Sequence, residues 1–517
     1  MILIIIILSG ILLRLYNLPN IFYYAIDEEK GLYIIDGIAH LSHFPLAGPP
    51  SSIGFRLGPL LYYLLAPLYR IPGGFPLTWG YLSIFLSAVT MILIYCIGAK
   101  IGKKTGVIAL ILYAFSYLVG VYESRGWQLS FHPLFVLTVF YCLWKLKEHK
   151  AQYFYLLITT LVIASQAEVA TLLLIPFTIM VVIINHISIP RKTLIIGITA
   201  FLFLNSGIFV FDLRHNFLNS EYLLNYFRPS SQNRTAKNIP LVGTRSVYLA
   251  HNLIPNTLSR ILYPGNTENI AVQYANCPNY LKYKQDNVPT WLNLLTLAII
   301  IFFLYMTIKD LKKPDTKTFF QKNISMFTIL VFAGIAVYTY FFHGEMAEYY
   351  LIMVFPCFIL MTASVINNIL STKFRYSIII ILALFLGLNG YFRLRSNNPY
   401  GLENKMNAVR YIESVVNKQP FELLSFQTCW YSGGYRYLFT KTQNEPVVTY
   451  MDNYLSEYYT PNRTLNPIYE IILLTPELID PQPPGYEEYK SKIAQESEFH
   501  NTFGAIEVYG RKIPQQP

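Results

Sequence analysis

Three consecutive acidic residues, Asp27-Glu28-Glu29, precede a segment whose apolar residues have helical spacing. An aspartate in front of a helix is a good N-cap, and the two following glutamates suit the positive end of the helix dipole. One cap, however, needs only one acid. A carboxylate held beside an apolar cavity can also act as a general base if it reaches a substrate hydroxyl. The two interpretations are compatible, because a capped residue is also a rigid one.

Further charged residues stand at the ends of apolar segments. The candidates for a site are Glu123, Arg125, Glu168, Arg214 and His215, together with Arg56 from an early loop. A long charged side chain at the end of a membrane span reaches the interface at little cost, so each one alone can be an anchor. Converging on one side, they suit an anionic lipid headgroup, because guanidinium binds phosphate through two parallel hydrogen bonds. The same side also carries Asp212, His343, Glu345 and Glu348.

The elements that must position these residues lie in a membrane. The chain has 517 residues, of which 54% are hydrophobic and 13% charged. Soluble globular proteins carry about 25% charged residues, so a water-soluble core is excluded, and the apolar content excludes disorder. Uncharged runs such as Leu77–Gly98 and Thr105–Tyr122 can cross ~30 Å of hydrocarbon. The sequence predicts a mainly α, polytopic bundle of transmembrane helices.

Eleven candidate spans can be placed, at residues 1–13, 76–98, 104–122, 129–144, 151–166, 169–187, 193–211, 288–308, 323–342, 349–371 and 376–392. With a cytoplasmic N-terminus, the inward connections contain fifteen Lys and Arg residues against three acids. This positive-inside bias accounts for the net charge of +11 and removes the argument for nucleic acid as a partner. We expect a multi-pass protein of the cytoplasmic membrane with its C-terminus outside.

Three outward segments are large: residues 14–75, residues 212–287 and the tail from 396 onward. We expect a membrane domain at 1–395 and a small extracytoplasmic α/β domain at 396–517. In the first segment, Lys30–Leu41 has the spacing of an amphipathic interfacial helix, and residues 58–69 form a second element too short to span. Two such helices would roof a cavity between the spans.

The tail has the pattern of a small domain with mixed secondary structure. Apolar residues recur at helical spacing in Lys405–Asn417. Strands are predicted at Phe421–Phe426, Pro446–Tyr450 and Tyr469–Leu474, and a proline-rich loop around Asp480–Gly485.

Metal and disulfide chemistry are only weakly indicated. No Cys and His spacing is typical of a zinc site. Cys277 and Cys429 both fall outside the membrane, where a disulfide between them is possible. Asp27, Glu28 and Glu123 could hold a divalent cation through oxygen ligands. A phosphate site built from arginines alone is equally economical, so metal dependence stays open.

Several strings resemble the GT-C membrane glycosyltransferases, in the branch of the protein O-mannosyltransferases and aminoarabinose transferases (glycosyltransferase family 39 type). The opening is Arg14-Leu-Tyr-Asn-Leu-Pro19, then Asp27-Glu28, then Gly58-Pro59-Leu-Leu-Tyr62. Three further stretches are similar to bacterial members: Glu123-Ser-Arg125-Gly-Trp127-Gln128 followed by His132-Pro133, Ala164-Ser-Gln166-Ala-Glu168, and Phe211-Asp-Leu-Arg214-His215-Asn-Phe217. The resemblance covers about residues 1–395 in layout.

The resemblance implies an inverting transfer of a sugar from a polyprenyl phosphate to a hydroxyl outside the cytoplasmic membrane, on a protein, glycan or lipid acceptor. Asp27 matches the first-loop aspartate that acts as base or orients the acceptor, and Arg56, Arg125 and Arg214 are candidates for the phosphate. Related transferases often have Asp or Asn where this chain has Gln128, and His where it has Glu168. A second catalytic carboxylate, from Glu123 or Glu168, is therefore open.

Two other classes compete with an enzyme. A transporter or flippase of a lipid-linked or small polar substrate usually places polar groups and broken helices near the midplane, whereas this chain concentrates its charges at one face. A membrane-anchored assembly protein would instead recruit its partner through the tail.

Overall fold

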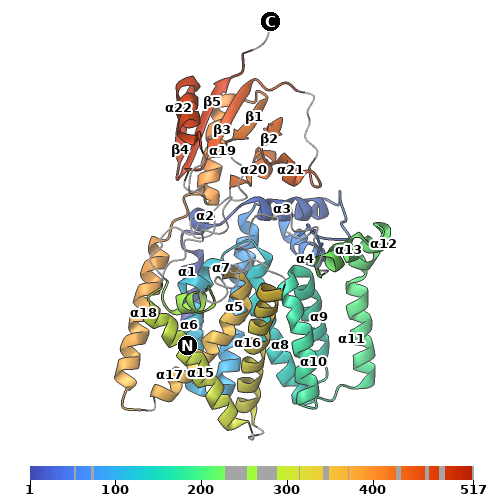
Figure 1. Cartoon of the computed structure of the whole chain (residues 1–517), viewed down its shortest axis with the longest axis vertical. Helices are drawn as coiled ribbons and strands as arrows, with labels where there is room; N and C mark the ends of the chain where they lie inside the picture. Colours follow the sequence, from blue (N-terminus) through green and yellow to red (C-terminus); the bar gives the residue numbers. More distant parts are fainter. Residues whose placement is uncertain are drawn as a thin grey trace.

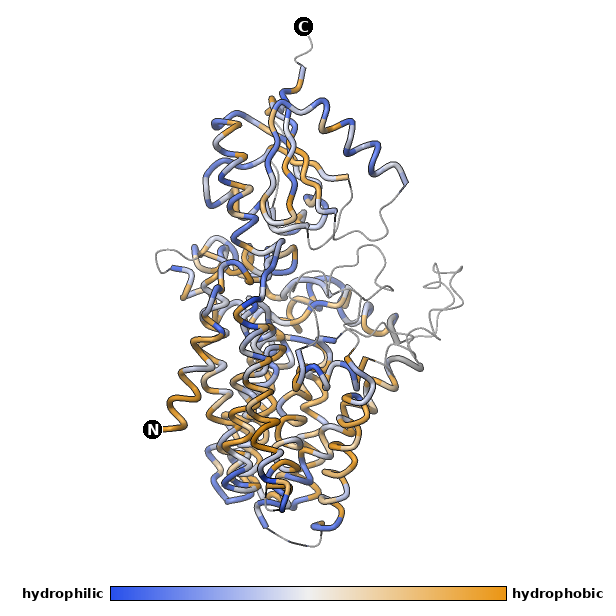
Figure 2. Tube along the Cα trace, turned by 90° about the vertical axis from the view of Figure 1, so that its left-hand side faces the viewer, coloured by the Kyte–Doolittle hydropathy of each residue, from blue (hydrophilic) through white to orange (hydrophobic). Residues whose placement is uncertain are grey.

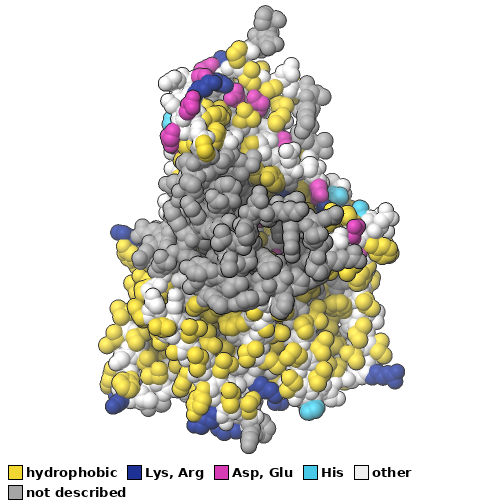
Figure 3. Space-filling model, viewed as in Figure 1, with side chains coloured by type: hydrophobic (Ala, Val, Ile, Leu, Met, Phe, Trp, Pro, Cys, Tyr) yellow, Lys and Arg dark blue, Asp and Glu magenta, His cyan; other side chains and the backbone are white. Residues whose placement is uncertain are grey.

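A computed structural model describes residues 1–51, 54–70, 75–227, 253–264, 288–311, 313, 315–341, 348–370, 372–426, 432–459, 465–476 and 484–514. Helices form a bundle that occupies the lower half of Figure 1, and a small sheet with its own helices lies above it. Apolar residues dominate the bundle along its length (Figure 2). On the face shown in Figure 3, hydrophobic side chains cover the bundle, and lysines and arginines gather at the end opposite the sheet.

The bundle consists of long and short apolar helices. The long ones are α5 (Leu77–Ile101), α8 (His132–Lys147, preceded by the 3-10 turn η1, Gln128–Phe131), α15 (Thr290–Asp310), α16 (Thr316–Phe341), α17 (Phe355–Leu370, preceded by η3, Glu348–Val354) and α18 (Arg375–Arg395). The shorter ones are α1 (Ile2–Leu15), α9 (Tyr153–Ala167) and α10 (Leu174–Ile184, preceded by η2, Val169–Leu173). Residues 253–262 form another helix, packed inside.

Two further spans are bent. Helix α6 (Lys103–Phe115) and helix α7 (Tyr117–Glu123) meet at 65°, and α11 (Arg191–Leu204) and α12 (Ser206–Arg214) meet at 43°. Within the described residues, six helices are long and apolar enough to cross a membrane, or up to eight if each bent pair is one span. All eleven predicted segments contain helix, but the predicted count of eleven spans is not confirmed, because three of them are shorter than a span requires.

Short helices lie across the end of the bundle that faces the sheet (Figure 1). They are α2 (Leu18–Ile21), α3 (Ile26–Ala39), α4 (Leu60–Tyr69) and α13 (Leu218–Phe227). The predicted helix at Lys30–Leu41 is confirmed, but it begins at Ile26 and so contains the acidic triplet in its first turn. Its apolar residues Leu32, Ile35 and Ile38 are buried, as an amphipathic helix resting on a bundle requires.

The part of the chain that follows helix α18, called the C-terminal domain below, contains a five-stranded mixed sheet in the order β2-β1-β3-β5-β4. Strand β1 (Phe421–Ser425) pairs in parallel with β2 (Val448–Thr449) and β3 (Tyr469–Leu474), while β5 (Ile506–Lys512) runs antiparallel to β3 and β4 (Phe499–Phe503). Helices α19 (Leu402–Val416), α20 (Tyr435–Thr442), α21 (Asp452–Leu455) and α22 (Tyr486–Glu496) complete it.

The predicted α/β character of the tail is confirmed, with helix α19 and strands β1, β2 and β3 close to their predicted positions. Register pairs Phe421 with Tyr469 and Ile471 with Gly510. Gly510 is required there, because an added Cβ would lie 2.2 Å from the ring of Phe499. The hairpin of β4 and β5 was not predicted from the sequence.

Candidate functional site

The three acids at the start of α3 have three different environments. Glu28 is buried, and its Oε2 accepts a hydrogen bond from the backbone N–H of Ala25 at 3.1 Å, which caps the helix. Glu29 is fully buried under the C-terminal domain. Asp27 is exposed, and within the described residues it has neither a hydrogen bond nor an ion pair. Of the three carboxylates, Asp27 is the one that solvent reaches.

Glu28 and Arg125 form a buried pair rather than two separate site groups. The Nη2 of Arg125 donates to Oε1 of Glu28 at 3.0 Å. The guanidinium lies between two aromatic rings, 3.8 Å from the centroid of Tyr23 and 4.1 Å from that of Trp127. Burial raises the pKa of Glu28 more than the positive charge of Arg125 lowers it. This stacking and pairing hold Arg125 in place beside the first turn of α3.

Glu29 connects α3 to the C-terminal domain. Its two carboxylate oxygens accept hydrogen bonds from the backbone N–H groups of Gly434, at 3.0 Å, and Tyr437, at 2.8 Å. Burial raises the pKa of Glu29 to about 7, against the lowering effect of these bonds and of Lys405. The sequence analysis included Glu29 in the triplet but gave it no role of its own, because its partners lie more than 400 positions away.

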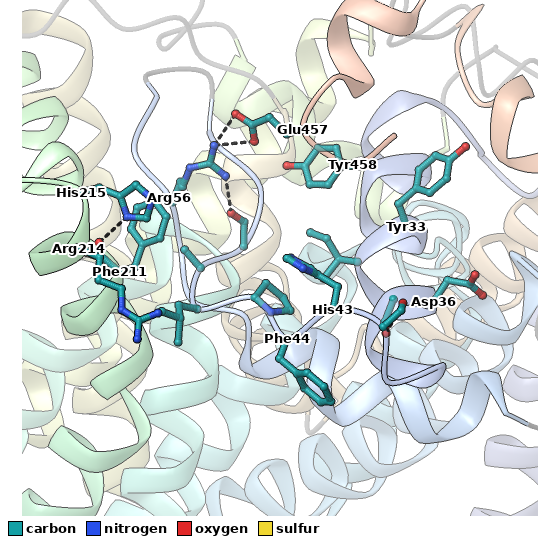
Figure 4. A pocket seen from close by; sticks show the side chains of 17 residues that line it. Tyr33, Asp36, His43, Phe44, Arg56, Phe211, Arg214, His215, Glu457 and Tyr458 are labelled. Atoms are coloured by element: carbon teal, nitrogen blue, oxygen red, sulfur yellow. Dashed lines mark hydrogen bonds and ion pairs between the residues drawn. The ribbon is translucent and has the colours of Figure 1, made fainter. Parts of the chain in front are cut away.

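A pocket of about 670 Å³ lies between α3, the loop after it, α12 and the C-terminal domain. Its lining includes the basic side chains of Arg56, Arg214, His43 and His215. Figure 4 shows Arg56 next to Glu457 and Tyr458 of the C-terminal domain, with Tyr33 and Asp36 of α3 on the other side. The pocket thus brings together three of the residues predicted from the sequence: Arg56, Arg214 and His215.

Arg56 is held by several contacts but stays accessible. Its Nη2 donates to both carboxylate oxygens of Glu457 at 2.6 Å, and its Nη1 donates to the carbonyl oxygen of Gly48 at 3.2 Å. The side chain of Asn219 fixes the backbone of Arg56, accepting from its N–H at 2.6 Å and donating to its carbonyl oxygen at 3.0 Å. A carboxylate from the C-terminal domain therefore occupies the position that an anionic ligand of Arg56 would take.

Arg214 and His215 stand at the end of helix α12, and both are exposed. The ring of His215 stacks on Phe211, with centroids 4.1 Å apart, and its Nδ1 lies 2.7 Å from the carbonyl oxygen of Phe211. Asp212 caps the next helix by accepting from the backbone N–H of Asn219 at 2.7 Å. Among the described residues, the guanidinium of Arg214 has no acceptor, so its donors are available to a ligand of the pocket.

Glu168 is close enough to Asp27 for the charge of Asp27 to act on it. It stands half-buried between α9 and η2, where its side chain accepts from the backbone N–H of Val169 at 3.0 Å. Burial raises the pKa of Glu168 to about 7, and the negative charge of Asp27 adds to this. The same charge also raises the pKa of Tyr458, after the larger effects of burial and Glu457, while Arg56 lowers it. Tyr458 lines the pocket and Asp27 does not, so the charge of Asp27 acts on the pocket without Asp27 belonging to its lining.

Glu123 is in a different place. It is buried in an ion pair with Arg14, Nη2 to Oε2 at 2.8 Å, and accepts from the hydroxyl of Tyr113 at 2.5 Å. Arg14 also donates to the carbonyl oxygens of Gly10, Tyr113 and Ala114. The acid cluster of Asp27, Glu28 and Glu123 considered for a divalent cation is not assembled, because Arg14 and Arg125 pair with two of its members. No group of three metal-ligating side chains occurs in the described ranges.

Other residues selected from the sequence lie beyond what the structure describes or have structural partners. His343, Glu345, Cys277 and Cys429 fall outside the described residues. Glu348 is buried and forms an ion pair with Arg260. The site residues that the sequence analysis missed are Glu457 and Tyr458, which carry no local signal and reach the pocket only because the C-terminal domain lies on α3.

Comparisons with known proteins identify the fold. The solved structure of ArnT from Cupriavidus metallidurans bound to undecaprenyl phosphate superposes with a TM-score of 0.54 at 9% identity, covering 98% of this chain and 97% of that chain. The oligosaccharyltransferase of Archaeoglobus fulgidus, in complex with Zn and sulfate, matches with a TM-score of 0.50 at 11% identity, covering 91% of this chain and 68% of that chain. No protein-family model and no curated protein sequence matches. The predicted GT-C fold is confirmed.

Proposed function

We propose that this chain is a membrane glycosyltransferase that moves a sugar from a polyprenyl phosphate to an acceptor hydroxyl on the outer face of the cytoplasmic membrane. The observation that carries the proposal is the exposed carboxylate of Asp27, which is unpaired within the described residues of a GT-C fold. Its charge acts on Tyr458, a lining residue of the pocket that also contains Arg56 and Arg214. Residues 1–395 would form the membrane domain and residues 396–517 an extracytoplasmic domain. The ArnT structure, which holds undecaprenyl phosphate, supports the class of donor.

Asp27 suits the part of general base. Its neighbours Glu28 and Glu29 are buried and each accepts two hydrogen bonds, so neither is available to a substrate. An exposed carboxylate can accept the proton of an acceptor hydroxyl within hydrogen-bond reach. In the proposed step the acceptor oxygen forms a bond to the anomeric carbon as the bond from that carbon to phosphate oxygen breaks. The hydroxyl proton passes to Asp27, and the polyprenyl phosphate leaves with the electron pair.

Arg214 and Arg56 are the side chains that would bind the phosphate of the donor. A phosphate leaving group hardly needs protonation, so fixed positive charge is what its departure requires. Arg214 is exposed at the pocket, and the carboxylate paired with Arg56 is that of the half-exposed Glu457, which an anionic ligand can displace. Arg125 is already paired with Glu28 and stacked between two rings. We therefore assign Arg125 to holding α3 rather than to the phosphate.

The test is a transfer assay with the full chain in lipid nanodiscs and a panel of radiolabelled polyprenyl-phosphate sugars. Wild type should release polyprenyl phosphate, and Asp27→Asn should lower the rate by about 1,000-fold, since general-base catalysis contributes about 10²–10⁴-fold. Asp315→Asn is the matched control, because Asp315 caps helix α16 at the opposite end of the bundle. Transfer by Asp27→Asn at the wild-type rate would contradict the role of this residue, and no turnover of any donor by wild type would contradict the function.

A further inference from the structure

The C-terminal domain contacts the segment from residue 20 to residue 29 at nearly every second residue. The backbone N–H of Asn398 donates to Oδ1 of Asn20, and the N–H of Leu402 donates to the carbonyl oxygen of Phe22 at 3.0 Å. An added Cβ at Gly401 would lie 1.9 Å from the carbonyl oxygen of Asn20, so the two backbones touch. These contacts run directly up to the turn that carries Asp27.

Lys405 makes the next contact. Its Nζ is buried and donates to the carbonyl oxygen of Tyr24 at 2.7 Å and to that of Gly433. One ammonium thus joins the segment before α3 to the loop before α20. Burial lowers the pKa of Lys405 to about 7, and the negative charges of Glu29 and Glu28 oppose this.

Glu29 makes the last contact, two residues after Asp27. Its carboxylate accepts from two N–H groups at the first turn of α20, where a helix leaves its own N–H groups without an intrahelical acceptor. Gly434, the N-cap of α20, has a φ of +100°. An added Cβ there would meet the ring of Tyr24 at 2.9 Å, so glycine allows both the turn and the close approach.

We propose that Glu29 and Lys405 are positioning residues, through which the C-terminal domain holds the first turn of α3 and thereby sets the place of Asp27. Asp27 lies between Tyr24 and Glu29, so the turn is fixed on both sides of it. The inference rests on the proposed role of Asp27. It makes the C-terminal domain part of the scaffold of the reaction centre, even though the described lining of the pocket includes neither residue.

The contacts predict an effect on the rate rather than on donor binding. Displacing a catalytic group by 1 Å can lower a rate by about 10²-fold. Within the described residues, the pocket arginines have no hydrogen bond or ion pair with the first turn of α3: Arg56 bonds to Gly48 and to Glu457, and Arg214 stands at the end of helix α12. Loosening the first turn of α3 should therefore lower kcat while the KM for the donor changes little.

The kinetic test compares Glu29→Ala, Glu29→Gln and Lys405→Met with wild type in nanodiscs. Glu29→Ala loses both acceptors and should lower kcat by about 100-fold. Glu29→Gln keeps one acceptor oxygen, so its kcat should lie between those of wild type and Glu29→Ala. A role in packing alone does not predict this intermediate value. Glu470→Gln is the matched control, because it removes a half-buried ion pair with Arg511 within the sheet and should leave kcat unchanged. A kcat of Glu29→Ala within twofold of wild type, or a rise in KM alone, overturns the proposal.

A second measurement needs no turnover. Hydrogen–deuterium exchange of the amides at residues 29–32, the first of α3 with an acceptor one turn earlier, should be slow in wild type and in Glu470→Gln. It should be at least tenfold faster in Glu29→Ala and Lys405→Met. Unchanged exchange in both variants overturns the attachment itself. If wild type transfers no sugar, the function proposed above fails while the exchange result still decides whether Glu29 and Lys405 hold the turn. If Glu29→Ala does not fold, the Gln and Met variants give the same comparison.

Discussion

Two regions of this molecule contain arginine and glutamate side chains. In one region these side chains are buried and paired, and in the other they are exposed or half-exposed. Between α1 and α7, Arg14 and Glu123 are buried, and Arg14 donates to three backbone carbonyl oxygens besides its partner. At the pocket, Arg214 is exposed without an acceptor in the described part of the chain, and Arg56 pairs with a half-exposed glutamate. Both regions looked alike in the sequence, as charges at the ends of apolar spans.

The difference teaches how to separate structural from functional charges in such a bundle. A buried charge must have its hydrogen bonds satisfied inside the protein, because desolvation is costly. Once satisfied, it has no donor or acceptor left for a ligand. A charge at the edge of a pocket can remain unsatisfied at little cost because water solvates it, and a substrate can replace that water. Glu123 falls in the first class and Arg214 in the second. Asp27 does not line the pocket, but it is exposed and likewise unsatisfied within the described residues.

The largest effect on stability should come from breaking the buried pair. Glu123→Ala leaves Arg14 buried without its counter-charge, so the free energy of unfolding should fall by about 3–5 kcal/mol. Thermal unfolding in detergent measures this, with Asp27→Asn as the comparison. Asp27 is exposed and has no polar partner among the described residues, so its variant should unfold at nearly the wild-type temperature. Equal unfolding temperatures of Glu123→Ala and Asp27→Asn would contradict the distinction between buried, paired charges and exposed, unpaired ones.

A smaller effect is expected for Arg214→Ala. Removing one charge-assisted contact to the phosphate should raise the KM for the polyprenyl-phosphate donor by about 10- to 100-fold, equivalent to about 1.5–3 kcal/mol. The fold should be unchanged, because the side chain is exposed and has no polar partner within the described residues. Steady-state kinetics at varied donor concentration measure it, and a KM equal to that of wild type would place the phosphate elsewhere.

The smallest effect is a pH dependence from Glu168. Its folded-state pKa of about 7 lies above the ordinary 4.5, because burial opposes the charged form. The contribution of Glu168 to stability is therefore greatest below pH 4.5 and is lost as the pH rises through 7. Glu168→Gln should unfold at the same temperature as wild type at about pH 4.5 and about 2 °C higher at about pH 8. A constant difference across this range would show that Glu168 does not titrate there.

Much of the fold could be predicted because its signal is local. Uncharged runs of span length and the positive-inside bias identify a membrane bundle without any knowledge of packing. The count of spans could not be settled, because helices such as Tyr153–Ala167 are shorter than the membrane core and others bend. Strand β4 was missed because most of its side chains are exposed, so its sequence lacks the apolar alternation of a buried strand.

The site was predictable only in part. Asp27, Arg56, Arg214 and His215 could be selected from residue type and position in the chain. The partners that decide which charges are free could not, because those contacts join distant segments: Arg14 with Glu123, and Arg56 with Glu457, 401 positions apart. Arg125 and Glu123 were therefore predicted as site residues, although each forms an ion pair within the protein.

The most direct test is a structure of the full chain in nanodiscs with undecaprenyl phosphate bound. The account predicts that the phosphate lies in the pocket against Arg214 and Arg56, with the carboxylate of Glu457 displaced from Arg56, and that Asp27 faces it. Arg14 and Arg125 should keep their pairs with Glu123 and Glu28. A phosphate bound at Arg125, with Arg214 and Asp27 left in solvent, would contradict the account.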